Sequence, residues 1–328
     1  MKLFFNKIRT FPINSLAILS IYTLTAIASA TGCGSTHDQK SLSKQPPTSL
    51  ALQDIAPEAL PDSEEELREL SPPVLLHSDK SFRFGMAAVG DSITAGFNAY
   101  RPLINRDYSW ATGWRANGLV DSIYLKLMRA VGNVSATNVA ISGSKAEDIG
   151  AQIDKLADAD LDYISVLIGA NDVCQWPADY KESLQTYKAD VARGLAQLTA
   201  DHKGIHIDLG TIPNIMHLYN LGKSSGACQR KWNTTKFCSL LRSDTTAADV
   251  EAFAASWRDA NAALAEIAQR FPDNVRLITK LSAPIFTPDE ISPYDCFHPN
   301  TDGQSMLANI VWDGGWLKPL VAAKLAEH

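Results

Sequence analysis

Beyond residue 82, short apolar runs alternate regularly with amphipathic segments, and this alternation restricts the fold more than any other feature of the chain. The apolar runs are bounded by Gly, Asp or Asn, as is typical of parallel strands that are covered on both faces. The predicted strands span residues 83–89, 135–141, 162–168, 204–211 and 274–279.

Between these runs, apolar residues recur at spacings of three and four, which predicts helices packed against a sheet. The predicted helices lie around residues 120–127, 149–156, 184–198, 250–267 and 306–311, and the last is expected to end before Pro319. Strand–helix alternation of this length predicts a single doubly wound α/β domain. In such a domain the functional site lies beyond the carboxyl ends of the strands.

The composition fits one sizeable core, since 45% of the 328 residues are apolar. The formal net charge is −6, and Lys and Arg form no run outside the extreme N-terminus. Because proteins that bind nucleic acid normally present a basic face, no nucleic-acid partner is expected.

The first 33 residues are predicted to be a targeting signal. Three basic residues (Lys2, Lys7 and Arg9) precede an uncharged apolar stretch, 16–30, that is too short to span a membrane comfortably. The sequence Ala-Ser-Ala at 28–30 fits an ordinary cleavage site, which would release a secreted protein.

The next residues allow a second interpretation of this signal. The sequence Ala30-Thr31-Gly32-Cys33 resembles a bacterial lipoprotein signal, although leucine is commoner at the position of Ala30. That resemblance implies that Cys33 carries lipid and anchors an exported protein in a membrane that faces the periplasm or cell surface. Residues 34–80 are polar and rich in proline, which predicts a flexible tether before a folded domain at 81–328.

Four stretches at the predicted strand ends supply the parts that acyl transfer requires, namely a nucleophile, a base, an orienting acid and oxyanion donors. The first strand ends at Gly90-Asp91-Ser92, which makes Ser92 the candidate nucleophile. His298 is the best candidate base because Asp295, three residues earlier, can hold its ring and stabilise its charged form. Gly143 and Asn171 follow the second and third strands as candidate oxyanion donors.

Each of these stretches also has an ordinary structural explanation as a turn or a helix cap. Such explanations fit any one stretch, but they do not account for all of them at successive strand ends. His202, His206 and Asp208 have a spacing seen in metal sites, but the last two fall on a predicted strand, and no metal or other cofactor is expected.

These motifs resemble the four sequence blocks of the GDSL/SGNH hydrolase superfamily, in the family's order. The sequences that surround three of these motifs are similar to the phospholipase B-like branch. They are Asn138–Asp148, Ile168–Cys174 and Asp295–His298. The resemblance implies a three-layer α/β/α flavodoxin-like sandwich with a five-stranded parallel sheet. It also implies a triad of Ser92, His298 and Asp295, with an oxyanion hole made by Ser92 N–H, Gly143 N–H and Asn171.

The five cysteines suggest two disulfides if Cys33 carries lipid, although buried free thiols are the alternative. Four cysteines allow three connectivities. A Cys228–Cys238 bond is favoured because it closes a short loop, and this leaves Cys174–Cys296, which would tie the oxyanion loop to the acid–base loop.

Two long insertions, 97–116 and 213–245, are expected to form walls of a substrate cleft. The sequence therefore predicts a carboxylic ester hydrolase. Its expected substrates are lipid esters, lysophospholipids among them, or small acyl esters. The same residues would also serve a short-chain acetyl or choline esterase, or an acyltransferase. A surface lipoprotein that binds lipid or glycan without catalysis is the alternative of a different class.

Overall fold

The computed structural model describes residues 83–326, so the predicted signal segment, the predicted tether and Cys33 lie outside the described residues. All five predicted strands are present: β1 (Phe84–Gly90), β2 (Val134–Asn138), β3 (Tyr163–Leu167), β4 (His206–Gly210) and β5 (Val275–Ile278). They form one parallel sheet in the order β2-β1-β3-β4-β5. The predicted five-stranded parallel sheet is therefore confirmed.

The strands differ in how completely they are covered. Every residue of β1 and β3 is buried, as the apolar runs predict for strands covered on both faces. The edge strand β2 is partly exposed along its length, because it has a neighbouring strand on one side only.

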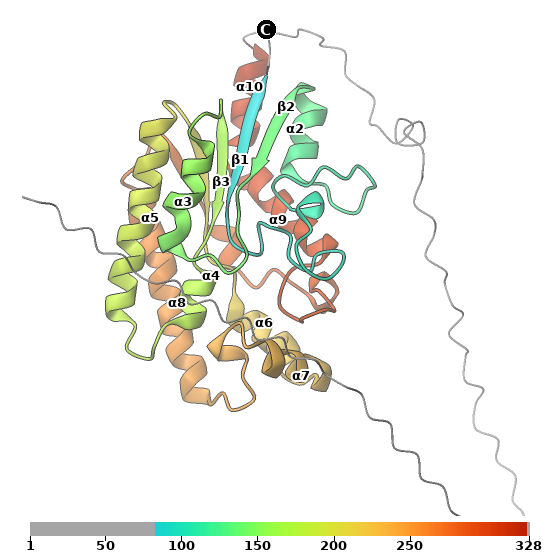
Figure 1. Ribbon diagram of the computed structural model, residues 1–328, viewed down its shortest axis with the longest axis vertical. Coiled ribbons are helices and arrows are strands. Elements are labelled where there is room, and N and C mark those ends of the chain that lie inside the picture. The colour runs from blue at the N-terminus through green and yellow to red at the C-terminus, as the bar shows by residue number, and fades with distance from the viewer. Residues whose placement is uncertain (1–82, 327–328) are drawn as a thin grey trace, which may run out of the picture. The chain divides into compact units, whose positions relative to one another are not determined.

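Nine helices surround the sheet in the described part of the chain. They are α2 (Ile123–Val131), α3 (Ile149–Ile153), α4 (Ala170–Gln175), α5 (Lys181–Asp201), α6 (Ile215–Gly222), α7 (Gly226–Thr235), α8 (Ala247–Ala268), α9 (Thr301–Gly314) and α10 (Leu317–Ala326). Helices α3, α5 and α8 pack together over one face, and α2, α9 and α10 cover the other (Figure 1). The domain thus has the three layers of the predicted α/β/α sandwich.

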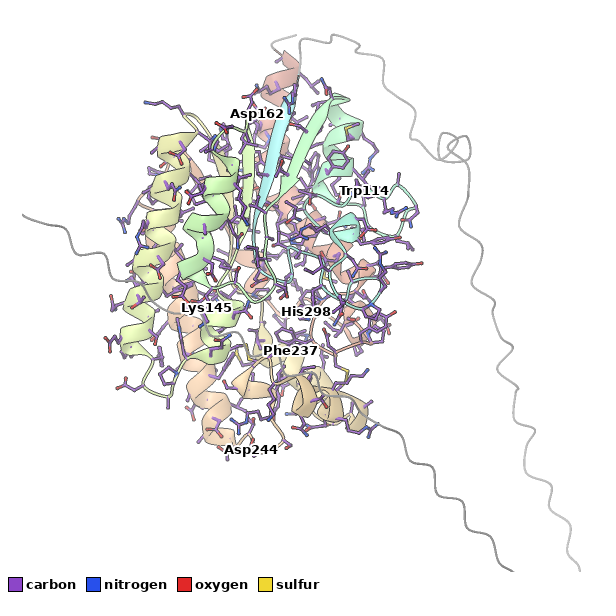
Figure 2. All side chains as sticks on the ribbon, viewed as in Figure 1. Trp114, Lys145, Asp162, Phe237, Asp244 and His298 are labelled. Carbon is purple, nitrogen blue, oxygen red and sulfur yellow. A yellow bond between two sulfur atoms is a disulfide. The ribbon has the colours of Figure 1, made fainter. Side chains whose placement is uncertain are left out.

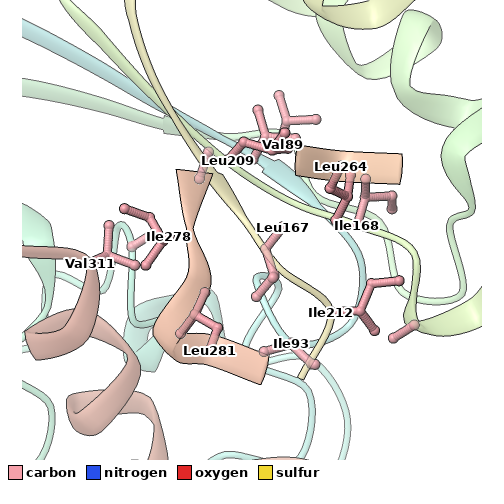
Figure 3. Packing of buried hydrophobic residues seen from close by; sticks show 14 of the residues in the cluster. Val89, Ile93, Leu167, Ile168, Leu209, Ile212, Leu264, Ile278, Leu281 and Val311 are labelled. Atoms are coloured by element: carbon pink, nitrogen blue, oxygen red, sulfur yellow. The ribbon is translucent and has the colours of Figure 1, made fainter. Parts of the chain in front are cut away.

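The core lies between these layers. Figure 3 shows it near the carboxyl ends of the strands, where Val89, Leu167 and Leu209 pack with Leu264 of α8. All four side chains are at most 1% exposed. Burial of one such side chain contributes about 1.5–3 kcal/mol relative to leaving it in water.

One helix boundary and the number of helices differ from the predictions. Helix α2 begins at Ile123 because Ser122 caps it by accepting a hydrogen bond from Leu125 N, so Val120 lies outside the helix. Helix α9 ends before Pro319 as predicted, but it is not the last helix, because α10 follows it. Pro319 lies in the first turn of α10, where a helix does not need the missing N–H.

The two insertions also take distinct forms. Residues 97–116 form turns and a short 3-10 helix, Arg106–Tyr108, whereas 213–245 contain α6, α7 and the 3-10 helix Ser239–Leu241. Figure 1 places α6 and α7 beyond the carboxyl edge of the sheet. None of the described helices is long and apolar enough to cross a membrane.

The strand order determines where a site can form. Sequential connections run from β1 outward to β2, then return past β1 to β3, β4 and β5. The direction of winding therefore reverses between β1 and β3, and ligands of doubly wound sheets bind at this reversal. The stretches that carry Ser92 and Asn171 follow these two strands.

Candidate active site

Ser92, His298 and Asp295 form a continuous hydrogen-bonded chain. Nε2 of His298 lies 2.8 Å from Oγ of Ser92, and Nδ1 lies 2.6 Å from Oδ2 of Asp295. The serine is 206 residues away from the histidine in sequence, so the fold alone brings them together. All three residues are buried, with exposures between 2% and 7%, which keeps bulk water from competing for these bonds.

The surroundings of Asp295 keep it ionised. Oδ1 accepts hydrogen bonds from the backbone N–H groups of Phe297 and His298, and Oδ2 accepts one from the side-chain amide of Asn98. Burial by itself would raise the pKa of Asp295, but the charge of His298 and these hydrogen bonds outweigh it and hold the pKa below its usual value. A carboxylate cannot donate, so Nδ1 of His298 carries the proton and Nε2 is free to accept from Ser92.

The turn that presents Ser92 contains a buried carboxyl of different character. Asp91 accepts a hydrogen bond from Ile93 N at 2.9 Å, whereas its Oδ2 has no partner in the described part of the chain. Burial raises the pKa of Asp91 to about 6. This residue therefore shapes the turn and takes no part in the hydrogen-bonded chain to His298.

Gly143 is exposed and lies in the loop that follows β2. Its φ of +87° lies in the left-handed region, where a residue with a side chain is strained. No atom lies within 4 Å of the position that a Cβ would take, so conformation and not crowding explains the glycine. Among residues 83–326, neither Gly143 N–H nor Ser92 N–H is used in a hydrogen bond, which leaves both available to a ligand.

Asn171 lies in the first turn of α4 and is half-buried. Its Nδ2 donates one hydrogen bond to Ser144 O at 2.9 Å, and an amide has a second hydrogen to offer. The neighbouring Asp172 accepts from Ala146 N with both oxygens, at 3.1 and 3.3 Å. Burial raises the pKa of Asp172 to about 7. Together these two residues hold the loop that carries Gly143.

Gln152 of α3 fixes the other side of that loop. Its side chain is fully buried, accepts from Gly90 N at 2.9 Å, and donates to Gly90 O and to Ser144 Oγ. One amide thereby connects the last residue of β1 to the residue after Gly143. We infer that it positions the N–H groups on both sides of the site.

Three aromatic rings surround the imidazole of His298. The ring centroids of Phe97 and Phe297 lie 5.0 Å from it, and that of Phe237 lies at 5.6 Å with its ring edge-on. Figure 2 shows Phe237 next to His298. Phe97 and Phe237 are partly exposed and come from the two insertions, so each insertion contributes one ring beside His298.

The predicted disulfide connectivity is wrong. The bonds are Cys174–Cys238 and Cys228–Cys296, in place of Cys228–Cys238 and Cys174–Cys296. The short loop expected between Cys228 and Cys238 is mostly the helix α7, which is rigid and separates the two residues along its axis. Each cysteine at the rim of the site is therefore joined to the insertion, and the two rim cysteines are not joined to each other.

Two of the remaining sequence candidates, Asp208 and His206, have structural roles. Asp208 accepts hydrogen bonds from Tyr163 Oη and Trp316 N, and the ring of His206 packs edge-on against Trp316. Within residues 83–326, no group of three or more His, Cys, Asp or Glu residues is placed to hold a metal ion.

Sequence reasoning overlooked Asn98, Gln152 and Phe237. Gln152 had a detectable signal, because it lies between Ile149 and Ile153 on the apolar face of a predicted helix, where a polar side chain needs a buried partner. Nothing in the local sequence marks Asn98 or Phe237, since both act through contacts with the distant segment 295–298.

Comparisons with known proteins place the chain in a family. Residues 86–311 match the profile of a family described as GDSL-like lipase/acylhydrolase. A search of curated proteins gave no match.

Several solved structures have a similar fold. A family 3 carbohydrate esterase from Clostridium thermocellum is 14% identical with a TM-score of 0.47, covering 74% of this chain and 100% of that chain. An extracellular lipase from Streptomyces rimosus is 17% identical with a TM-score of 0.44, over 74% and 99%. A variant of an acetylxylan esterase from Geobacillus stearothermophilus is 18% identical with a TM-score of 0.43, over 70% and 93%.

At such low identities these likenesses concern the fold and say nothing about substrate. The family match, in contrast, spans more than half of the 328 residues and includes every stretch described in this site. The protein therefore belongs to the GDSL-like lipase/acylhydrolase family and is an ester-bond hydrolase.

Proposed function

We propose that the protein is a serine-dependent carboxylic ester hydrolase in which Ser92, His298 and Asp295 act as the catalytic triad. The observation that carries the proposal is the unbroken chain of hydrogen bonds from Oγ of Ser92 through the imidazole to Oδ2 of Asp295, with lengths of 2.8 and 2.6 Å. This is the arrangement in which an imidazole can remove the serine proton during attack.

In the first half of the reaction, Oγ of Ser92 attacks the acyl carbonyl while its proton moves to Nε2 of His298. The ionised Asp295 stabilises the imidazolium that forms. Nε2–H then protonates the alcohol oxygen as the carbon–oxygen bond breaks, which leaves the acyl group on Ser92. A water molecule, activated by the same Nε2, releases the acid and restores the serine.

The negative oxygen of each tetrahedral intermediate would be held by three donors: the N–H groups of Ser92 and Gly143, and Nδ2 of Asn171. Support comes from the two free backbone N–H groups and from the second amide hydrogen of Asn171. Removal of one donor of this kind typically lowers the rate by ~10²–10³.

The substrate is proposed to carry an apolar group near the leaving alcohol. Because Nε2 of His298 must reach the alcohol oxygen, that part of the ester lies next to the imidazole, where Phe97 and Phe237 are partly exposed. Lipid esters, including lysophospholipids, fit this surface and agree with the resemblance to the phospholipase B-like branch. Short acetyl or choline esters, or transfer to an alcohol other than water, would use the same residues.

The site is proposed to work outside the cytoplasm. The N-terminal sequence resembles an export signal, and Cys33 stands where a lipoprotein would be lipidated and anchored to a membrane. Mass spectrometry of the membrane fraction tests this, because a diacylated Cys33 as the first residue is expected. Cleavage after Ala30, with release of the protein, would contradict the lipid anchor but not the export.

The catalytic proposal is tested by hydrolysis of p-nitrophenyl esters from acetyl to palmitoyl, together with a lysophospholipid. Ser92→Ala is expected to lower kcat by more than about 10³-fold. Ser256→Ala is the matched control and is expected to retain full activity, because Ser256 is a buried serine of α8 whose hydroxyl donates to Phe253 O.

A serine-reactive phosphonate supplies an independent readout. It is expected to label Ser92 in the wild type and in Ser256→Ala, but not in Ser92→Ala. Full activity in Ser92→Ala would overturn the proposal. Unlabelled Ser92 and no hydrolysis of any ester would favour a lipoprotein that binds without catalysis.

A further inference from the structure

Exposed apolar side chains are concentrated in one segment of the described chain, residues 100–119. Eight large apolar residues are more than a third exposed within residues 83–326, and five of them lie in the segment 100–119. Two more, Ile141 and Tyr294, lie next to site residues in sequence. We call these seven residues the apolar lip: Tyr100, Leu103, Ile104, Trp114, Leu119, Ile141 and Tyr294.

Contacts hold parts of the lip together. Tyr294 donates to Tyr100 O at 3.3 Å, and the ring of Tyr100 stacks on Tyr108 at 4.6 Å. Arg106 donates to Ala140 O at 2.7 Å, which ties the segment to the residue before Ile141. Exposed apolar side chains gathered in one segment mark a candidate site of interaction with a protein or a membrane.

The backbone at Leu103 is held in a strained conformation. Its φ is +74°, a region that a leucine rarely adopts, and its side chain is 67% exposed. Hydrogen bonds in both directions with Asn98 fix it, at 2.7 and 2.8 Å. The fold thus stabilises a conformation that exposes an apolar side chain, and such strain tends to occur at functional positions.

The exposed charge of segment 100–119 is positive. Segment 100–119 contains Arg101, Arg106 and Arg115 but only one acid, Asp107, which gives +2 in a chain of net charge −6. The side chain of Asp107 is 9% exposed and lies 3.3 Å from both Arg101 and Arg115, whose side chains are 52% and 41% exposed. The acid is therefore covered while the guanidinium groups face water.

We propose that the apolar lip docks on the surface of an anionic lipid bilayer. Tryptophan, tyrosine and aliphatic side chains next to exposed arginines have the composition of surfaces that insert shallowly into anionic lipid. The aliphatic members, above all Leu103, distinguish the lip from a carbohydrate platform, which is built from aromatic faces. The docking itself is independent of catalysis, and only the delivery of lipid esters to Ser92 rests on the proposed function.

Asn98 links the lip to the site. Its Oδ1 accepts from Leu103 N, and its Nδ2 donates to Oδ2 of Asp295. Asn98 is therefore hydrogen-bonded both to Leu103, which is proposed to enter the membrane, and to Asp295 of the triad.

The test uses the intrinsic fluorescence of the full chain. All seven tryptophans lie within residues 83–326, and Trp114, at 56% exposed, is the one tryptophan there that is more than a third exposed. Figure 2 shows it on the loop that projects beside α2. Vesicles contain equal parts of phosphatidylglycerol and phosphatidylcholine, and the phosphatidylcholine is either ordinary or brominated in its acyl chains.

Brominated lipid is expected to quench the wild type and the inactive Ser92→Ala variant equally, and Trp114→Phe is expected to abolish that quenching. Trp176→Phe is the matched control and should retain it, because Trp176 packs on Tyr180 and Tyr187 under α5. Leu103→Asp is expected to weaken vesicle affinity by on the order of tenfold or more, through lost apolar contact and added negative charge.

Three results would overturn the proposal. One is equal emission of the wild type in brominated and ordinary vesicles. Another is a change in Trp114 emission with soluble acetylated xylo-oligosaccharides and none with vesicles, which would assign the lip to carbohydrate. The last is a dimer in light scattering that Leu103→Asp dissociates, with no quenching by lipid. Because quenching needs no turnover, none of these results depends on the outcome of the Ser92→Ala activity assay.

Discussion

Asn98 donates its side-chain amide to Oδ2 of Asp295 over 2.5 Å, across 197 residues of sequence. A hydrogen bond to a charged acceptor contributes about 1.5–3 kcal/mol. Asn98→Ala is therefore expected to lower kcat by about 10–100-fold, because Asp295 loses the donor that fixes Oδ2 against His298. Asn117→Ala is the matched control, since Asn117 donates to Tyr108 Oη in the same segment, away from the triad.

The variant Asn98→Asp tests whether the charge or the size of the side chain matters at this position. The added carboxylate keeps the size of the side chain but repels Asp295 and favours protonation of its neighbours. The acidic limb of the kcat/KM profile is expected to move to higher pH than in the wild type or in Asn98→Ala. An unshifted limb would show that Asn98 acts only by filling space.

Gly143→Ala is expected to lower kcat by about 10² while destabilising the fold only slightly. Left-handed backbone costs a residue with a side chain roughly 1–2 kcal/mol, and relaxation of that strain would turn the N–H away from the oxyanion. Gly132→Ala is the control, because Gly132 also has a positive φ of +78° and nothing within 4 Å of a Cβ, yet caps α2. Urea unfolding and kcat should separate the two variants. Equal kcat values would count against Gly143 as a donor.

Asp208 makes folding stability depend on pH. Burial raises its pKa to about 7 from 3.8, so the folded state binds the proton more tightly than the unfolded chain. The contribution of protonated Asp208 to folding stability is complete at low pH, decreases as the pH rises above about 4, and is lost by about pH 7. Asparagine does not titrate. The free energy of unfolding of Asp208→Asn minus that of the wild type should therefore increase by about 2–4 kcal/mol as the pH rises from 4 to 8. A pH-independent difference in urea unfolding would refute this.

The disulfide connectivity can be checked directly. Peptide mapping without reduction is expected to recover Cys174 with Cys238 and Cys228 with Cys296. Replacing Cys174 and Cys238 together by serine should lower the free energy of unfolding by up to about 4 kcal/mol, given a sequence separation of 64 residues. Recovery of a peptide in which Cys228 is bonded to Cys238 would instead support the pairing that was predicted from the sequence.

Local patterns explain what the sequence could predict. Strands such as β1 and β3 are fully buried, so their apolar runs stand out, and the residues that follow them meet at one edge because the strands are parallel. Ser92, Gly143, Asn171 and His298 could thus be chosen as candidates from their positions at the ends of elements.

Contacts between distant segments determine the features that the sequence could not predict. The pairing of Cys228 depends on α7 forming inside an insertion that has no strong helical periodicity, and a loop-length argument then chooses the wrong partner. Asn98 has a role only because its turn folds against Asp295, and no spacing in the sequence records that approach.

The two disulfides are interleaved, since Cys228 lies between Cys174 and Cys238, and its own partner Cys296 lies beyond both. Cysteines paired in their order of synthesis would join Cys174 to Cys228, which is not a native bond. Of these four disulfide-bonded cysteines, three are synthesised before Cys296, so Cys228 must stay reduced, or leave a non-native bond, until residue 296 is available. Wherever Cys228 enters a non-native bond first, the native pair forms only by thiol–disulfide exchange, and expression with an isomerase should then raise the yield more than expression with an oxidant alone.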